Sequence, residues 1–130
     1  MPGTLLLDCE GLSKLYLKDR KVIGLVQAAT DEAIRVATTA MTTIEADFEG
    51  VHAARVNWVL ARIDVYEVTM PVASNAAALL RTHHLHGHEN AIDAVLAAVA
   101  RSSAVPVTVL TSDPEGLSPL CGPAIEIAKV

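Results

Sequence analysis

The sequence contains very few aromatic side chains and no excess of positive charge. Aromatic residues make up 3% of the 130 positions, so Ala, Val, Leu and Ile must supply the hydrophobic core. The formal net charge is -5 at pH 7. This balance argues against binding nucleic acid through a large basic surface, although it leaves room for brief contact with a nucleic acid at a metal centre.

Cysteines, a signal peptide and long apolar runs are also scarce or missing from the sequence. Cys9 and Cys121 are too few for a disulfide framework and are expected to be reduced thiols. The first residues, MPGTLLLDCEG, lack the basic segment and the apolar run of a signal peptide. No uncharged apolar run reaches the ~18 residues of a membrane helix. We therefore expect a cytoplasmic protein with no membrane partner.

The composition that is present predicts a compact globular chain. Hydrophobic residues are 52% and charged residues 19% of the sequence, which is typical of a folded protein and not of a disordered one. The length predicts a single domain over residues 1–130.

Short apolar segments alternate with amphipathic segments along the chain. Strands are predicted at 4–7, 34–38, 63–67 and 105–111, with a weak final strand in 124–130. Helical spacing is predicted between them, including a helix after the second strand with Thr42 or Thr43 as N-cap and Glu45 in its first turn. This order predicts an α/β fold whose parallel sheet is covered on both faces.

Acidic side chains follow three of the predicted strands. Asp8 ends the first strand, Glu45 comes just after the second, and Asp113 follows the strand at 105–111. Parallel strands place these residues at one edge of the sheet, where open α/β sheets bind ligands. The fourth acid, Asp93, lies inside the apolar helix NAIDAVLAAVA, where a lone charge is unfavourable unless something pairs with it.

A shared metal site would explain why these carboxylates gather. Two carboxylates ~4 Å apart repel by about 4 kcal/mol at an effective dielectric of ~20. Oxygen ligands of this kind suit Mg²⁺ or Mn²⁺, and an ion so held activates water for phosphodiester hydrolysis. The alternative is that each acid has only a local structural role. Asp8 and Asp113 would then be turn residues, Glu45 would interact with the positive end of a helix dipole, and Asp93 would be an isolated charge near a helix start.

Four segments resemble, in order, the successive motifs of the PIN domain family and, more narrowly, of VapC-like toxin ribonucleases. They span about residues 5–120 and comprise LLLDCEGLSKL, TTIEADFEG, ENAIDAVLAAVA and VTVLTSDPEGLSPL. The matching positions are Asp8, Glu45, Asp93 and Asp113. Cys9 departs from the pattern, because a small or hydroxyl residue is common after the first Asp and a soft thiol does not favour Mg²⁺.

The resemblance implies a three-layer α/β/α sandwich with a central parallel sheet and an acidic Mg²⁺ or Mn²⁺ pocket. It implies a metal-dependent endoribonuclease that attacks an RNA phosphodiester in line with metal-activated water, and commonly a homodimer neutralised by a small antitoxin protein. By this resemblance Asp8, Glu45, Asp93 and Asp113 are the metal-binding and catalytic carboxylates. Thr111 or Ser112 would position a water or a carboxylate.

Four of the five histidines lie at 83–88, just ahead of the helix that carries Asp93. His84 and His88 have the four-residue spacing of a helical Zn²⁺ site, but Gly87 is expected to break the helix between them. We therefore interpret the cluster as a polar turn between two helices. An accessory role beside the pocket or the RNA is the alternative for His88 or Glu89.

Two other functional hypotheses remain open. One is a catalytically weak or inactive PIN-like module that mainly binds a partner protein. The other is an unrelated doubly wound domain that binds a small phosphorylated ligand, which the lack of a Gly-rich phosphate loop disfavours. Trp58 is interpreted as a core or dimer-interface residue and not as a platform on which bases stack, since no basic residues cluster around it beyond Arg55 and Arg62.

Overall fold

The computed structural model describes residues 2–130, and this part of the chain forms five strands and seven helices. The strands are β1 (Thr4–Leu7), β2 (Arg35–Thr39), β3 (Asp64–Tyr66), β4 (Val107–Thr111) and β5 (Glu126–Lys129). The helices are α1 (Cys9–Tyr16), α2 (Arg20–Asp31), α3 (Ala40–Ala46), α4 (Ala53–Leu60), α5 (Met70–Thr82), α6 (Gly87–Ser102) and α7 (Pro114–Cys121).

All strand pairs in the single sheet are parallel, and the strand order is β3-β2-β1-β4-β5. β1 is central, and its register with β4 places Leu7 opposite Leu110. The predicted parallel sheet is therefore confirmed, including the weak final strand, which forms an edge of the sheet.

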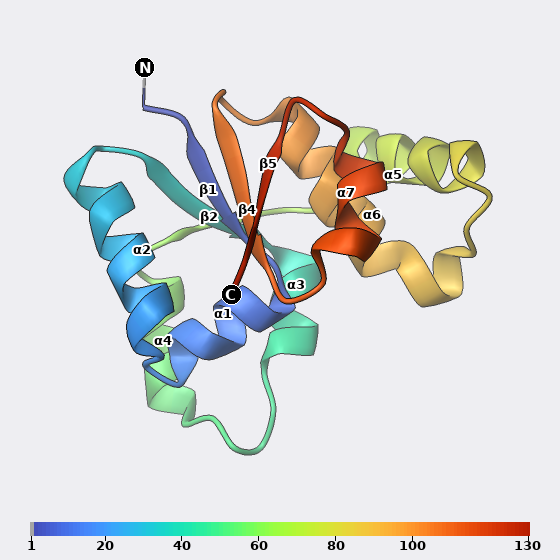
Figure 1. The fold of residues 1–130 in the computed structure, drawn as a ribbon. Helices are drawn as coiled ribbons and strands as arrows, with labels where there is room; N and C mark the ends of the chain where they lie inside the picture. The colour runs from blue at the N-terminus through green and yellow to red at the C-terminus, as the bar shows by residue number, and fades with distance from the viewer. Residues whose placement is uncertain (1) are drawn as a thin grey trace.

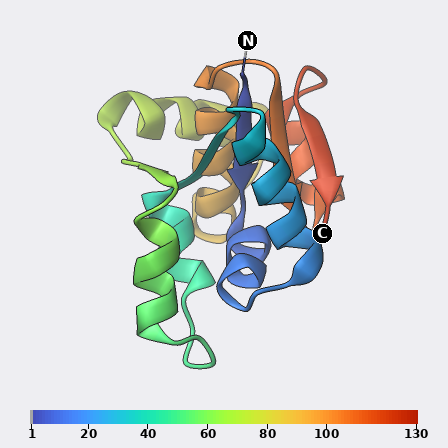
Figure 2. The ribbon, with the colours of Figure 1, turned by 90° about the vertical axis from the view of Figure 1, so that its left-hand side faces the viewer.

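Helices cover both faces of the sheet, so the chain is a three-layer α/β/α sandwich (Figure 1). Leu5 and Leu7 of β1 point to one face, where they pack with residues of α1, α2 and α4. Leu6 points to the other face and packs with α6 and α7. α5 packs mainly on α6, outside the sheet, and the turned view shows α1 and α2 in front of the strands (Figure 2). The alternation follows from the two-residue period of a strand.

The predicted start of α3 is wrong by one helical turn. Thr39, the last residue of β2, is the N-cap, and its Oγ1 accepts a hydrogen bond from the Thr42 amide at 3.1 Å. The Thr39 and Thr42 hydroxyls also bond to each other at 2.8 Å and are fully buried. Glu45 consequently lies in the last turn of α3 and not in the first. The sequence pattern did not predict this cap, because Thr39 is both the last residue of β2 and the N-cap of α3.

Trp58 does not belong to the core, which was one of its two predicted roles; its role in a dimer interface stays a prediction. Its side chain on α4 is 49% exposed, whereas its neighbours Val56 and Val59 are buried. The core under α4 is filled by these smaller residues, which leaves the indole at the surface. Within residues 2–130 no helix has both the length and the apolar character that crossing a bilayer requires.

Candidate metal centre

The carboxyl ends of β1 and β4 bring Asp8 next to the segment Thr111–Asp113. The Asp8 amide donates a hydrogen bond to the Leu110 carbonyl at 3.1 Å, which continues the pairing of the two strands. Thr111 is the last residue of β4 and is buried. The prediction that Asp8 and Asp113 lie at one edge of the sheet is thus met by the strand register itself.

Asp8 is a nearly buried carboxylate that also caps α1. Its side chain is 7% exposed, and its Oδ1 accepts a hydrogen bond from the Gly11 amide at 2.8 Å. Burial raises the pKa of Asp8 above its ordinary value of 3.8, while hydrogen bonds from the Gly11 amide and the Thr111 hydroxyl offset part of that rise. These bonds hold the carboxylate in one orientation.

Asp93 lies in the second turn of α6 and shares its electrostatic environment with the other three acids. Burial raises the pKa of Asp93 above 3.8, and the charges of Asp8, Glu45 and Asp113 raise it further. No positive side chain contributes to the shift. In the described part of the chain, no side chain or amide hydrogen-bonds to the Asp93 carboxylate. Asp8 and Asp93 therefore lie on the same side of the molecule, and no positive side chain among residues 2–130 contributes to the pKa of either carboxylate.

Glu45 reaches this site from the last turn of α3, and Cys9 holds its carboxylate. The Cys9 thiol donates to Glu45 Oε1 at 3.3 Å. Burial, followed by the charge of Asp8 and the hydrogen bond to Glu45, raises the pKa of Cys9 to about 12. The thiol is therefore protonated at neutral pH and acts as a hydrogen-bond donor to Glu45. Sequence analysis missed this role because the two residues are 36 positions apart.

Asp113 caps α7 as Asp8 caps α1. Its Oδ1 accepts from the Gly116 amide at 3.2 Å, and its own amide donates to Thr111 Oγ1 at 3.0 Å. Thr111 thus connects two acids, because its hydroxyl also bonds to Asp8. A role of Thr111 in positioning a water or a carboxylate for catalysis stays a prediction. Ser112 is half-buried between the two, and no hydrogen bond of its side chain is described.

Gly116 leaves space that the Asp113 carboxylate occupies. A Cβ at position 116 would lie 2.4 Å from Asp113 Oδ2 and 3.1 Å from its Cγ. We expect Gly116→Ala to displace the carboxylate, to remove the cap and to lower the unfolding free energy by about 1 kcal/mol, as measured by urea denaturation.

Gly24 provides the matched control for this substitution. It lies in the exposed part of α2, and a Cβ there meets no atom within 4 Å. Gly24→Ala should stabilise the chain by about 0.5–1 kcal/mol, because alanine is the better helix former. Equal effects of the two substitutions would show that the Asp113 carboxylate does not depend on Gly116.

The charges of Asp8, Glu45 and Asp113 act on Asp93, but the four predicted ligands are not drawn together around an ion. Across residues 2–130, no three His, Cys, Asp or Glu side chains are close enough to hold a metal jointly. The chemistry of the donors nevertheless fits a hard divalent cation, since all four are carboxylates and their charge is uncompensated. Asp8, Glu45, Asp93 and Asp113 are the residues that could hold such an ion.

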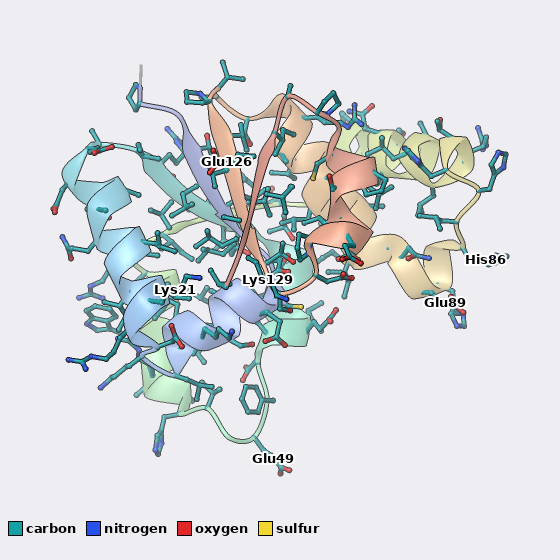
Figure 3. The ribbon with its side chains drawn as sticks, viewed as in Figure 1. Lys21, Glu49, His86, Glu89, Glu126 and Lys129 are labelled. Carbon is teal, nitrogen blue, oxygen red and sulfur yellow. The ribbon has the colours of Figure 1, made fainter. Side chains whose placement is uncertain are left out.

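The histidine segment lies away from the sheet and forms the turn between two helices. α5 ends at Thr82 and α6 begins at Gly87, so His84 and His88 do not share a helix. His84 has a positive φ of 55° in this turn. Figure 3 shows His86 and Glu89 pointing outward at the margin of the molecule. His88 is exposed at the start of α6, and an accessory role for it remains a prediction.

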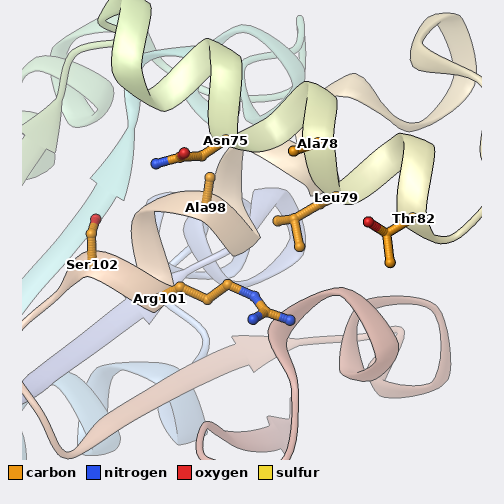
Figure 4. Close-up of a pocket in the computed structure, with 7 residues that line it drawn as sticks. All are labelled: Asn75, Ala78, Leu79, Thr82, Ala98, Arg101 and Ser102. Carbon is orange, nitrogen blue, oxygen red and sulfur yellow. The ribbon is translucent and has the colours of Figure 1, made fainter.

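A separate cavity of about 330 Å³ lies between α5 and α6 (Figure 4). Its polar lining comes from Asn75, Thr82, Arg101 and Ser102. Arg101 follows Asp93 by eight residues on α6, which is about 12 Å along the helix axis. None of the four predicted ligands lines this cavity, so it is distinct from the candidate metal centre.

Comparison with solved structures identifies the fold. The chain is similar to a chain in the crystal structure of VapBC2 from Rickettsia felis bound to a DNA fragment from their promoter, with a TM-score of 0.69 and 9% sequence identity. The match covers 98% of both chains. The sequence matches no protein-family model, and no curated protein is similar to it in sequence. The two chains therefore share a fold over nearly their whole length, although few of their residues are identical.

Proposed function

We propose that the protein is a PIN-like, VapC-like toxin that cleaves RNA with the help of Mg²⁺ or Mn²⁺. The proposal rests on the placement of the acids: Asp8 and Asp113 follow the adjacent parallel strands β1 and β4 at one edge of the sheet. The pKa of Asp93 agrees with this placement, since it is raised by burial and then by the charges of Asp8, Glu45 and Asp113. A protein gains nothing in stability from such a cluster unless a ligand neutralises it. The fold shared with a chain of VapBC2 supports the toxin class.

The side chains divide the work of such a site. Asp8, Glu45, Asp93 and Asp113 would hold the ion, which when bound lowers the pKa of water and polarises a phosphoryl oxygen. Gly11 and Thr111 fix the orientation of Asp8, and Cys9 fixes that of Glu45. A carboxylate of the set can accept the proton of the attacking water. The water oxygen then bonds to the RNA phosphorus as the P–O bond on the opposite side breaks, and the leaving ribose oxygen takes a proton from solvent.

Cleavage of RNA by the purified protein tests this proposal. We expect a single-stranded RNA to be cut in the presence of Mn²⁺ or Mg²⁺ and to remain intact in EDTA. Metal should also raise the melting temperature, because an ion that binds only the folded state stabilises it by mass action. RNA that stays intact with either ion, together with an unchanged melting temperature, would contradict the proposal.

The toxin assignment has its own test. VapBC2 is named as a pair of proteins, and by analogy this chain would be neutralised by a small antitoxin protein. Expression of this chain in the cytoplasm of a host cell should arrest the growth of that cell. Co-expression of the gene that neighbours the gene of this chain should relieve the arrest. The predicted homodimer is tested separately by light scattering of the purified protein.

A protein-binding module with little or no catalysis is the second candidate. The observation that favours it is the spacing of the acids, since no three metal-ligating side chains in residues 2–130 lie within reach of one ion. Growth arrest without RNA cleavage, and binding of the antitoxin without a metal effect, would support this alternative.

A further inference from the structure

Trp58, the single tryptophan of the chain, forms an exposed cationic stack with two arginines of the same segment. The guanidinium carbon of Arg62 lies 3.8 Å from the centre of the indole ring, and that of Arg55 lies 4.8 Å from it. Both distances are within the range of cation–π attraction. The indole is 49% exposed, so this stack is presented to solvent.

Backbone carbonyls, not carboxylates, hold the two guanidinium groups. Arg55 donates to the carbonyls of Leu15 and Tyr16 at 2.9 and 3.2 Å, and Arg62 donates to the Trp58 carbonyl at 2.9 Å. Within residues 2–130 the one ion pair joins Arg35 and Asp64. The charges of Arg55 and Arg62 are therefore fixed in place without an anion to balance them.

A cavity of about 320 Å³ adjoins the stack, between α1, α2 and α4. Trp58 and Arg62 line one part of it, and Gln27 and Thr30 of α2 supply further polar atoms. The remaining lining is apolar, from residues such as Val59 and Ile63. The Gln27 amide already donates to Asp31, and the Thr30 hydroxyl donates to the Val26 carbonyl. A flat ring can thus meet an indole and a guanidinium plane at one place.

Helix α1 connects this surface to the candidate metal centre. Asp8 caps the first turn of α1, and Arg55 bonds to the carbonyls of Leu15 and Tyr16 in its last turn. The eight residues of α1 span about 12 Å. This is the length of about four nucleotides at the ~3.4 Å spacing of a stacked strand.

We propose that Trp58, Arg55 and Arg62 form a second binding site for the single-stranded RNA substrate, with a nucleobase stacked on the indole or guanidinium plane and a phosphate beside the guanidinium groups. This inference rests on the proposed function. Bases stack on aromatic rings and on arginine, and the phosphate supplies the missing anion. The site also solves an electrostatic difficulty, because the carboxylates repel phosphates and the substrate must gain affinity elsewhere.

The fluorescence of Trp58 tests binding directly, because the chain has no other tryptophan. The experiment uses the Asp8→Asn protein in EDTA, so that an eight-nucleotide RNA is bound but not cleaved. We expect the RNA to quench the fluorescence with saturation. An oligonucleotide with the same phosphates but no bases should bind about tenfold more weakly, as loss of base stacking requires.

Substitutions in the otherwise wild-type protein then test the role in cleavage. Trp58→Ala should raise KM for the eight-nucleotide RNA by about tenfold with little change in kcat, and Trp58→Phe should restore most of the loss. Arg62→Gln should weaken RNA binding. It should also reduce the slope of log affinity against log salt concentration by the amount expected for about one phosphate contact. Arg81→Gln makes the same charge change at an exposed position on α5, and it should alter neither the RNA affinity nor its salt dependence. A trinucleotide should be insensitive to all four substitutions.

Three results would overturn the proposal. They are fluorescence that does not respond to RNA, equal affinity for the base-free oligonucleotide, or a KM that Trp58→Ala leaves unchanged. Quenching by an acidic polyglutamate peptide and not by RNA would assign the surface to a protein partner instead. These outcomes can be distinguished from a failure of the proposed function. Cleavage that does not change on substitution of Trp58 would contradict only the second binding site. RNA binding without any cleavage would contradict only the proposed nuclease activity.

Discussion

Asp8→Asn is expected to abolish metal-dependent RNA cleavage, with kcat reduced by at least about 10²-fold, while the protein stays folded. Asparagine keeps an oxygen that can accept the hydrogen bond from the Gly11 amide, and it caps helices as well as aspartate does. The substitution therefore removes the negative charge that would bind the ion and leaves α1 intact. Cleavage rates at saturating Mn²⁺, together with thermal melts, measure the two effects separately.

Glu10→Gln is the matched control, because it removes one negative charge two residues away. Glu10 is exposed in the first turn of α1, and it is the smallest of the contributions to the pKa of Asp8. Its substitution should change kcat by less than threefold, or roughly 0.6 kcal/mol in the barrier. Equal losses in the two variants would mean that general charge, and not a ligand at position 8, governs cleavage.

Asp93→Asn is expected to stabilise the metal-free protein while removing the stabilisation that metal provides. The carboxylate is half-buried, unbonded in the described part of the chain, and repelled by Asp8, Glu45 and Asp113. Its neutralisation removes this repulsion. Because solvent screens a partly exposed group, we expect a gain of about 1 kcal/mol, or about 2–5 °C in melting temperature. Calorimetry in EDTA measures the gain in stability of the metal-free protein, and calorimetry in excess Mn²⁺ measures the loss of the stabilisation by metal.

The stabilising effect of Asp93→Asn should depend on pH in a defined direction. The pKa of Asp93 is raised in the folded protein above the ordinary 3.8 that we assign to the unfolded chain. The folded state then holds the proton more tightly, so the wild type is relatively most stable below pH 3.8 and loses stability as the pH rises through the folded pKa. The difference between variant and wild type should vanish at low pH and grow to a plateau above the folded pKa.

Glu89→Gln serves as the control on the same helix. Glu89 lies exposed in the first turn of α6, where a negative charge is favourable to the helix dipole. Its neutralisation should leave the melting temperature unchanged or slightly lower, and it should not alter the effect of Mn²⁺. A stabilised Glu89→Gln, or an Asp93→Asn that is destabilised in EDTA, would show that crowding of carboxylates does not limit stability here.

The sequence by itself determined the sandwich and the region of the site. Period-two and period-3.6 patterns mark strands and helices from neighbouring residues alone, and short apolar strands separated by helices leave few arrangements other than a covered parallel sheet. Once the strands are parallel, Asp8 and Asp113 must emerge at the same edge. A local signal, an acid on an otherwise apolar helix, marked Asp93, but only the family resemblance placed it with the other three acids.

Only the tertiary structure decided how these side chains are held and which surface surrounds them. Two contacts join elements that are distant along the chain: Cys9 bonds to Glu45, and Thr111 links Asp8 to Asp113. The exposure of Trp58 likewise depends on how α4 packs on the rest of the fold. Local patterns carry no information on such pairings, because a side-chain hydrogen bond or a packed ring depends on atomic distances that are fixed when the whole core is assembled.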